Sequence, residues 1–391
     1  MSDADGGLEQ RDVVIAGGGP VGLALALGLA RAGLDVLVLE KADGPCAHSR
    51  APTIWPATQQ VFAELGLVER LEERGVTLSH PQIWDADRGV SLLSLPMDEL
   101  AAETSFPRLL ILPQSETVAI LHEEIRNTVG VEIRFSCKVS GFIQDSFGVD
   151  VICRRFGLEE RVRAKYVAGC DGEESTVRAH LGGKLEGKTY ATRAALADIR
   201  VSGGEDLAFP RISTDPRPVI ALRLGADIWR LIFPHSRRQP ADPERWISDA
   251  STRLFGKVPE ALIWSDTFSL HRRISSHWVK GRIVLAGDAA HLNSPVGGEG
   301  LDAGMQDAKL LSRALEAAVA VDHPQPLVNY VANRRRAMER GTGAFTDIAS
   351  RSLLFGGGRM IRPTFAIARL LFAVPGWRRR ILRRLALIDQ K

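Results

Sequence analysis

Hydrophobic residues in the first 170 positions form short runs separated by longer amphipathic stretches, a pattern typical of an α/β protein. Val13–Ala16 and Val36–Leu39 have the length of buried strands, and the apolar stretch between them predicts a helix that ends at Gly33. Another helix is expected to open at Pro113-Gln114, with Ser115 as its cap. Further strands are predicted at Leu109–Leu112, Val131–Val139, Val149–Arg154 and Arg161–Ala168.

The pattern becomes β-rich between Gly182 and about Leu270, where proline and glycine turns separate short segments. Strands are predicted there at Ala194–Val201, Val219–Leu224 and Ile228–Phe233, and Val76–Leu95 alternates in the same way. Helical patterns cover about 300–321 and 325–340, followed by a helical tail with breaks expected at Pro363 and Pro375.

These patterns predict a domain that is discontinuous in sequence, because the β-rich region is inserted between two of its strands. We predict a first domain made of residues 1–75, 101–181 and 271–324, a β-rich domain made of 76–100 and 182–270, and a helical C-terminal region at 325–391.

A glycine-rich turn joins the first strand to the first helix. Gly17 permits a tight turn, Gly19 lets the backbone approach a pyrophosphate, and Gly22 lets helix and strand pack closely. Pro20 stands in the first helical turn, where its missing N–H costs the helix nothing. Glu40 ends the next strand and is placed to bind a ribose 2′-hydroxyl. The order strand, glycines, helix, strand and acid therefore predicts a dinucleotide-binding unit.

Residues Gly281–Ala308 form a second strand, loop and helix junction, with a Gly287-Asp288 turn. Such a junction directs backbone N–H groups and the positive end of a helix dipole at the ligand, which favours an anionic or electron-rich molecule. Pro295 and the loop glycines leave space for a flat ring, and Asp288 can accept hydrogen bonds from a polyol. These properties indicate FAD. Asp171-Gly172 repeats the same turn after another buried strand.

Composition excludes several classes of function. The 391 residues carry a net charge of +3, which is too small to favour nucleic acid as a partner. No His or acid cluster has metal-site spacing, so no metal is expected. The N-terminus lacks an apolar signal core, and no apolar run reaches the roughly 20 residues of a transmembrane helix. The cysteines, Cys46, Cys137, Cys153 and Cys170, show no CxxC spacing, which favours free thiols in a cytoplasmic protein.

Three motifs in order resemble those of the class A flavoprotein aromatic monooxygenases, the p-hydroxybenzoate hydroxylase-like family. They are the glycine fingerprint at Gly17–Gly22, CDGEESTVR at 170–178, and GRIVLAGDAAHLNSPVGGEG at 281–300. The resemblance covers nearly the whole chain. It implies an α/β fold with a discontinuous Rossmann-like FAD-binding domain, an inserted β-rich substrate domain and a helical C-terminal region.

The resemblance also implies the site residues. Arg50 and Gln114 would touch FAD, although Arg50 by itself fits a solvated loop arginine equally well. Asp171 would lie near the pyrophosphate and the nicotinamide route, and Asp288 would hold the ribityl chain. Residues expected beside the reacting ring are Pro295, Gly297 and Gly298. The full cofactor-binding set is Gly17, Gly19, Pro20, Val21, Gly22, Glu40, Lys41, Arg50, Gln114, Val139, Asp171, Gly172, Arg178, Gly287, Asp288, Pro295, Gly298, Gly300, Leu301 and Asp302.

The implied reaction is a hydroxylation. NAD(P)H reduces FAD, oxygen adds at flavin C4a, and the hydroperoxide's distal oxygen attacks an aromatic or quinone-like small molecule. Because the chain has a single nucleotide fingerprint, NAD(P)H is expected as a transient co-substrate without a Rossmann domain of its own. The base that takes a proton from the substrate stays unassigned, since each polar candidate also fits an ordinary loop or surface residue: His48, Tyr190, Arg223 and His235.

Two acids depart from the pattern of many relatives, which carry Gln and Asn in this loop. Glu299 and Asp302 stand at the start of the predicted helix. A carboxylate beside the flavin N1–C2=O edge would oppose the negative charge of the reduced ring. The alternative is that both acids cap the helix and point away from the flavin.

Two other functions stay open, an FAD-linked oxidase or reductase on the same fold and a flavin-binding partner protein at a membrane. The second rests on the arginine-rich tail, where Leu370, Leu371, Phe372 and Trp377 accompany Arg378–Arg380. This helix would suit peripheral contact with an anionic membrane. Alternatively, its arginines are solvated and its apolar side packs on the core or on a partner subunit. A monomer or homodimer is expected.

Overall fold

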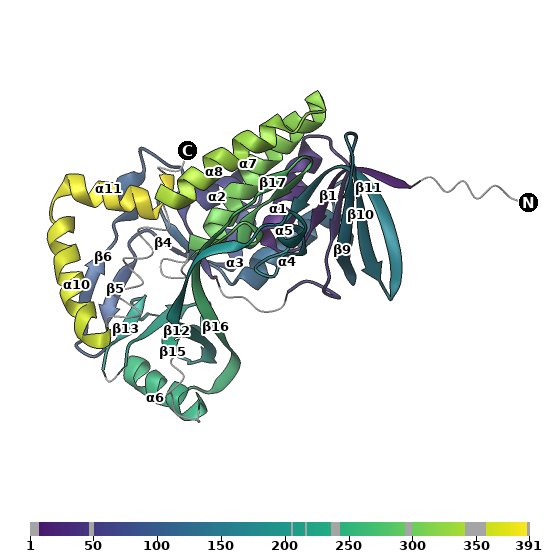
Figure 1. The fold of residues 1–391 in the computed structure, drawn as a ribbon. Coiled ribbons are helices and arrows are strands. Elements are labelled where there is room, and N and C mark those ends of the chain that lie inside the picture. Colours follow the sequence, from purple (N-terminus) through teal and green to yellow (C-terminus); the bar gives the residue numbers. More distant parts are fainter. Residues whose placement is uncertain are drawn as a thin grey trace, which may run out of the picture.

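The computed structural model describes residues 8–46, 51–204, 206–215, 217–235, 243–293, 299–340 and 357–388. The fold is α/β, as predicted, with a Rossmann-like sheet whose strands are discontinuous in sequence, an inserted β-rich region and a helical C-terminal region. Figure 1 shows the long strands β12 (Leu185–Arg200) and β16 (Ala261–Ser275), which belong to the second sheet, extending away from the first sheet.

The first sheet has a parallel centre. Its order is β17-β18-β11-β1-β2-β8, with β10 and β9 continuing antiparallel from β11. Its strands are β1 (Glu9–Ala16), β2 (Val36–Leu39), β8 (Val131–Arg134), β9 (Cys137–Gln144), β10 (Val149–Arg155), β11 (Leu158–Gly169), β17 (Val279–Lys280) and β18 (Ile283–Leu285). The prediction of one strand over Val131–Val139 was wrong, because the chain turns at Ser136, whose φ of 55° is left-handed.

Alternation along β1 separates two cores. Val13 and Ile15 lie in a cluster with the helices, whereas Val14 and Ala16 lie in a cluster with β9 and β10. The helices of the first cluster include α1 (Pro20–Arg31), α2 (Pro56–Glu64), α3 (Val68–Arg74), α4 (Gln114–Arg126), α7 (Glu299–Val321) and α8 (Gln325–Arg340). The opposite face carries α5 (Thr176–His180) through Val177.

The second sheet is β-rich, as predicted. Its order is β19-β16-β12-β15-β14-β13-β5-β6, and a small third sheet has the order β3-β7-β4. The strands not yet bounded are β3 (Thr53–Ile54), β4 (Val76–Leu78), β5 (Gln82–Asp85), β6 (Val90–Ser94), β7 (Leu109–Ile111), β13 (Arg211–Ser213), β14 (Val219–Arg223), β15 (Ile228–His235) and β19 (His291–Leu292). Short 3-10 turns are η1 (Met97–Leu100) and η2 (Gly287–Ala289), and helix α6 (Pro243–Phe255) was not predicted.

Two local predictions need correction. α4 begins at Gln114 with Pro113 at its cap position, so Ser115 lies inside the first turn instead of capping it. The break expected at Pro363 is absent from α10 (Gly357–Phe372), because Ile361 and Phe365 on either side of the proline anchor the helix to the second sheet. Pro375 does mark a boundary, as the first residue of α11 (Pro375–Leu385). The numerical domain boundaries given above stay a prediction.

The C-terminal helices lie against the β-rich region, beside β5 and β6 in Figure 1. Phe372 and Leu382 are buried in the core of the second sheet. Several tail arginines form ion pairs with acids of this region: Arg362 with Asp85, Arg378 with Glu99, and Arg379 and Arg383 with Glu103. Within the described ranges, no helix is long and apolar enough to cross a membrane.

Candidate active site

Four strands of the first sheet end together at one edge. Ala16 is in register with Leu39 of β2 and Gly169 of β11, and Gly169 is in register with Leu285 of β18. Backbone hydrogen bonds continue across the strand ends, from Gly17 N to Leu39 O at 2.8 Å and from Cys170 N to Ala16 O at 2.8 Å. The loops that follow parallel strands line the ligand crevice of such a sheet. The glycine fingerprint, Glu40, Asp171-Gly172 and Gly287-Asp288 therefore share one edge.

The glycine fingerprint is a close-packed turn with one open side. A Cβ added at Gly22 would lie 2.1 Å from Gly17 O, and one at Gly17 would lie 2.3 Å from Cys170 O. At Gly19 an added Cβ would meet no atom of the described residues within 4 Å. Pro20 begins α1, so the N–H groups of its first turn point toward the same opening. This arrangement fits a pyrophosphate in front of Gly19.

Glu40 fastens the fingerprint loop. Its Oε2 accepts a hydrogen bond from Gly18 N at 2.6 Å, and its Oε1 accepts one from Ala42 N at 2.8 Å. A carboxylate has about four acceptor positions, so these bonds leave capacity for a ribose hydroxyl. Lys41, which follows, is exposed.

Asp171 sits between β11 and α5. Its Oδ2 accepts hydrogen bonds from Thr176 N at 2.7 Å and Val177 N at 3.1 Å. Its Oδ1 is buried and has no hydrogen-bond partner within the described part of the chain. Buried polar oxygens are normally paired, so this orphan acceptor indicates a donor that a bound cofactor would provide. Gly172, with a φ of 77°, leaves the space beside it open.

Arg178 joins this turn to the Gly287-Asp288 turn. Its guanidinium donates to Glu173 O at 2.5 Å and to Ala289 O at 3.0 Å. Burial lowers the pKa of Arg178, against the pull of Asp171 and Glu173. The side chain thus spans the gap between the two motifs.

Val21 ties the fingerprint to the second junction. Its methyl carbon would lie 3.2 Å from a Cβ at Gly287 and 2.6 Å from one at Gly304. Glycine at both positions therefore lets α7 and the turn approach α1 closely. Asp288, at the tip of the turn, is exposed.

A buried polar network holds the Gly287 turn from behind. Asp307 Oδ2 accepts from Gly287 N at 2.9 Å and lies 2.6 Å from His291 Nε2, while Asp307 Oδ1 accepts from Arg334 Nε at 2.5 Å. Arg334 also donates to Ala303 O at 3.1 Å. Burial raises the pKa of Asp307, but the charges of Arg334 and His291 outweigh it and lower that pKa to about 2.

The sequence had not singled out Asp307 or Arg334 as members of a site. Arg334 is followed directly by two further arginines, a pattern typical of a solvated surface, yet it is almost fully buried. The sequence did contain one signal for Asp307. It lies four residues after Ala303 and four before Leu311, so it stands in the apolar stripe of α7. An acid in such a stripe needs a buried partner.

Asp302 is fully buried and faces away from solvent. Its Oδ1 accepts a hydrogen bond from Trp55 N at 2.9 Å, and its Oδ2 has no partner within the described ranges. The carboxyl group thus connects the first turn of α7 to the residue before α2. Burial raises the pKa of Asp302 to about 7. Glu299 begins α7, but its side chain lies outside the described structure.

We predict that Asp302 makes stability depend on pH. Because its pKa is raised in the folded state, its contribution favours folding at low pH and is lost as pH rises toward 7. Between pH 5 and pH 7 the loss is about 2 kcal/mol. Asp302→Asn cannot ionise and should show a flatter profile. Urea unfolding at several pH values measures this, and parallel profiles for the two proteins would contradict it.

The remaining predicted residues lie as follows. Gln114 is the first residue of α4, Val139 is buried in β9, and Leu301 is buried in the first turn of α7. An added Cβ at Gly300 would meet nothing within 4 Å among the described residues. Tyr190, Arg223 and His235 lie on strands of the second sheet. The predicted residues outside the described ranges are His48, Arg50, Pro295, Gly297 and Gly298.

Together these features fit FAD: an open helix N-terminus at Gly19, the acid Glu40 at the end of β2, an orphan acceptor on Asp171, and the exposed Asp288 beside α7. An elongated dinucleotide would span the edge from Glu40 to Asp288.

Comparisons with known proteins agree with this site. A family model described as FAD binding domain matches residues 10–343. Para-nitrophenol 4-monooxygenase of Pseudomonas sp. (strain WBC-3) is 30% identical over 316 residues, which are 78% of each chain. The aromatic compound monooxygenase YhjG of Bacillus subtilis (strain 168), itself uncharacterized, is 30% identical over 88% of this chain and 69% of its own.

Solved structures show the same likeness. The p-nitrophenol 4-monooxygenase PnpA of Pseudomonas putida DLL-E4 superposes with a TM-score of 0.89 at 27% identity, over 97% of this chain and 99% of that one. The anhydrotetracycline hydroxylase OxyS of Streptomyces rimosus gives a TM-score of 0.79 at 29% identity, over 97% of this chain and 76% of that one. The chain therefore belongs to the FAD binding domain family and is an enzyme of the FAD-dependent aromatic monooxygenase type.

Proposed function

We propose that this enzyme uses NAD(P)H and O₂ to hydroxylate an aromatic or quinone-like small molecule. The observation that carries the proposal is the shared edge at which four strand ends bring Gly19, Glu40, Asp171 and Asp288 together. Relatives named for aromatic compounds, para-nitrophenol and resorcinol among them, support the class of substrate.

In this proposal the chain binds and orients the cofactor. The α1 N-terminus at Gly19 holds the pyrophosphate, Glu40 holds the adenosine ribose, and Asp288 holds the ribityl chain. The α7 N-terminus faces the flavin ring with the positive end of its dipole, which favours negative charge there. Bound FAD would supply electron transfer from NAD(P)H to oxygen and delivery of one oxygen atom to the substrate.

Pro295, Gly297 and Gly298 lie outside the described residues, and their place beside the ring and the substrate stays an expectation from the resemblance. The route through flavin C4a is likewise part of the proposal. The β-rich region, within the boundaries predicted from the sequence, would cover the substrate and exclude water. We propose a cytoplasmic enzyme that meets NAD(P)H only transiently.

An FAD-linked oxidase or reductase is the enzymatic alternative. The fold alone does not decide between the two activities, because the structure of the Diels-Alderase PyrE3 is also similar, with a TM-score of 0.78 at 27% identity. One experiment distinguishes the monooxygenase from the oxidase or reductase. The yellow holoenzyme is mixed anaerobically with NAD(P)H in the presence of phenolic, quinolone and polyketide-like compounds. We expect at least one compound to accelerate flavin bleaching and, in air, to gain one oxygen. Bleaching by a compound that is merely dehydrogenated would favour the alternative, and a colourless protein would exclude both.

The outer side of the C-terminal helices carries a further proposal. Residues 357–388 contain eight arginines and no acid. Although four of those arginines pair with acids of the β-rich region, the outward face of α10 is apolar, with Leu370 73% and Ile367 61% exposed. Trp377 is 52% exposed at the start of α11, near the exposed Arg380. We propose that this face makes peripheral contact with an anionic membrane, since basic and apolar side chains with an interfacial Trp suit such a surface.

This contact predicts selective binding to vesicles. The enzyme should sediment with phosphatidylglycerol vesicles but not with phosphatidylcholine vesicles, and Leu370→Glu should weaken that binding at least about tenfold, because it places a charge in the apolar layer. Val129→Glu is the matched control, since Val129 is 93% exposed on another surface. Equal binding by both variants would contradict the proposal. A dimer in light scattering that only Leu370→Glu dissociates would assign the face to a second copy instead.

A further inference from the structure

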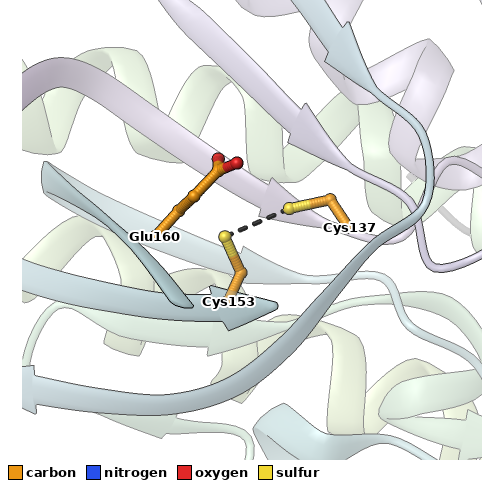
Figure 2. Close-up of side chains that lie close together, drawn as sticks. All are labelled: Cys137, Cys153 and Glu160. Atoms are coloured by element: carbon orange, nitrogen blue, oxygen red, sulfur yellow. Dashed lines mark hydrogen bonds between the residues drawn. The ribbon is translucent and has the colours of Figure 1, made fainter. Parts of the chain in front are cut away.

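Two cysteines on consecutive strands, 16 positions apart in sequence, lie side by side in the first sheet. Cys137 begins β9 and Cys153 lies on β10, and their Sγ atoms are 3.1 Å apart. Both residues are almost fully buried. Figure 2 shows the two thiols pointing toward each other, with the carboxylate of Glu160 beside them. Glu160 lies on β11 in register with Cys153.

A metal ion is one ligand that these three side chains would suit, because their ligand atoms all lie within 4.8 Å of one another. The sulfur spacing argues against it. Two thiolates on a tetrahedral zinc ion, each at about 2.3 Å, lie roughly 3.8 Å apart, which is wider than the 3.1 Å found here. Arg134, 3.9 Å from Glu160, and Arg155, in register with Cys137, also place positive charge around the cluster. The environment favours thiolate chemistry over cation binding.

The two thiols differ in reactivity. The hydrogen bond between the two sulfurs lowers the pKa of Cys137 against the effect of burial, with help from Arg155 and Arg134. The same hydrogen bond, together with burial, raises the pKa of Cys153. Arg155 Nε is buried without a hydrogen-bond partner in the described structure. Cys137 is therefore the better nucleophile and Cys153 the thiol held next to it.

We propose that Cys137 and Cys153 form a redox pair, which hydrogen peroxide oxidises to a reversible disulfide joining β9 to β10. The Cys137 thiolate attacks a peroxide oxygen and the O–O bond breaks, giving a sulfenic acid and a hydroxide that takes up the proton released by Cys137. The Cys153 sulfur then attacks the Cys137 sulfur, the S–O bond breaks, and the oxygen leaves as water with the Cys153 proton. Two electrons pass from the sulfurs to the peroxide.

The position of the cysteine pair decides how peroxide reaches it and which part of the cofactor site a disulfide would affect. Both cysteines are almost fully buried, so peroxide reaches them when the strands open locally beside Glu160, whose side chain is 35% exposed. Cys137 N donates to Glu40 O at 2.8 Å, and Ser136 N donates to Ala42 O at 2.7 Å. A disulfide would therefore fix the strand that supports the backbone of Glu40. The inference does not depend on the proposed hydroxylation.

Thiol mapping of the purified holoenzyme tests the proposal. A Cys46→Ser background removes the exposed thiol, which would otherwise cross-link molecules. After treatment with a small excess of peroxide and alkylation in denaturant, we expect one free thiol, at Cys170, and a crosslinked peptide pair containing Cys137 and Cys153. The thermal midpoint should rise and return to its starting value with dithiothreitol, because the link constrains the unfolded chain.

Single variants define the order of the steps. Cys153→Ser should stop at a sulfenic acid on Cys137 that dimedone traps, whereas Cys137→Ser should leave Cys153 unlabelled. Two results would overturn the proposal. One is full alkylation of both thiols in the Cys46→Ser protein after peroxide, at a concentration that oxidises Cys46 in the wild type. The other is stoichiometric zinc binding by the untreated protein that protects both thiols, which would make the cluster a metal site.

Discussion

Gly22→Ala is expected to abolish FAD binding. The new Cβ would lie 2.1 Å from Gly17 O and 3.3 Å from Cys170 Cβ, and backbone atoms cannot move aside as a side-chain end can. The fingerprint turn would have to open, at a cost of at least about 3 kcal/mol, which corresponds to a loss of affinity of at least about 100-fold. The ratio of flavin to protein absorbance in the purified enzyme, followed by FAD titration of the apoprotein, measures the effect.

Two further glycine variants separate loss of the ligand from loss of the fold. Gly19→Ala should leave the thermal midpoint of the apoprotein unchanged, because its Cβ enters open space, yet it should weaken FAD about 10-fold to 100-fold by crowding the pyrophosphate. Gly33→Ala should lower the thermal midpoint of the apoprotein and leave FAD affinity unchanged. Its φ of 80° makes alanine unfavourable by about 1 kcal/mol, and it lies at the far end of α1. Normal FAD affinity in Gly19→Ala would mean that the cofactor lies elsewhere.

Asp307→Asn is expected to lower the free energy of unfolding by about 3–5 kcal/mol. The substitution removes the negative charge to which buried Arg334 and His291 are bound, and leaves Arg334 without a counter-charge. FAD affinity should fall as well, because Asp307 also holds Gly287 N. Urea unfolding of the apoprotein and FAD titration measure the two effects separately.

The matched control is Asp322→Asn, which breaks an ion pair between Arg282 and an aspartate that is 68% exposed. Exposed pairs contribute less than about 1 kcal/mol.

The contribution of Asp307 to the free energy of unfolding should also depend on pH. Its pKa is lowered to about 2 in the folded protein, so its contribution is complete above about pH 4 and is lost as pH falls toward 2. Equal destabilisation by Asp307→Asn and Asp322→Asn would show that the buried network contributes no more to stability than a surface ion pair.

Local signals in the sequence predicted the parts of the site that depend on neighbouring residues. The strand, glycine turn and helix at Val13–Gly33 formed as predicted, ending in Gly33 with a left-handed φ. The helix expected near Gly300 begins at Glu299. Each of these depends on backbone conformations that a few adjacent residues impose.

Contacts between distant residues could not be predicted. The link between Asp307 and Arg334 joins two helices, and no periodicity in either reveals which acid meets which base. Cys137 and Cys153 are free thiols, as expected from the lack of CxxC spacing, but their spacing did not reveal that the β9–β10 pairing brings the two sulfurs together. The tail was expected either to lie on a membrane or to pack on the protein. In the structure, one face of the tail packs on the protein through Phe372, whereas Leu370 on the other face is exposed and belongs to the surface for which membrane contact is proposed.

Incorporation of oxygen from ¹⁸O₂ tests the central claim most directly. The holoenzyme would be supplied with NAD(P)H and a compound that accelerates flavin bleaching, under ¹⁸O₂ in ordinary water. An FAD-dependent monooxygenase must place one ¹⁸O atom in the product, seen in the mass spectrum as a gain of a single labelled oxygen. A product that is oxidised without the label, with all of the oxygen recovered as peroxide or water, would contradict the account and identify an oxidase.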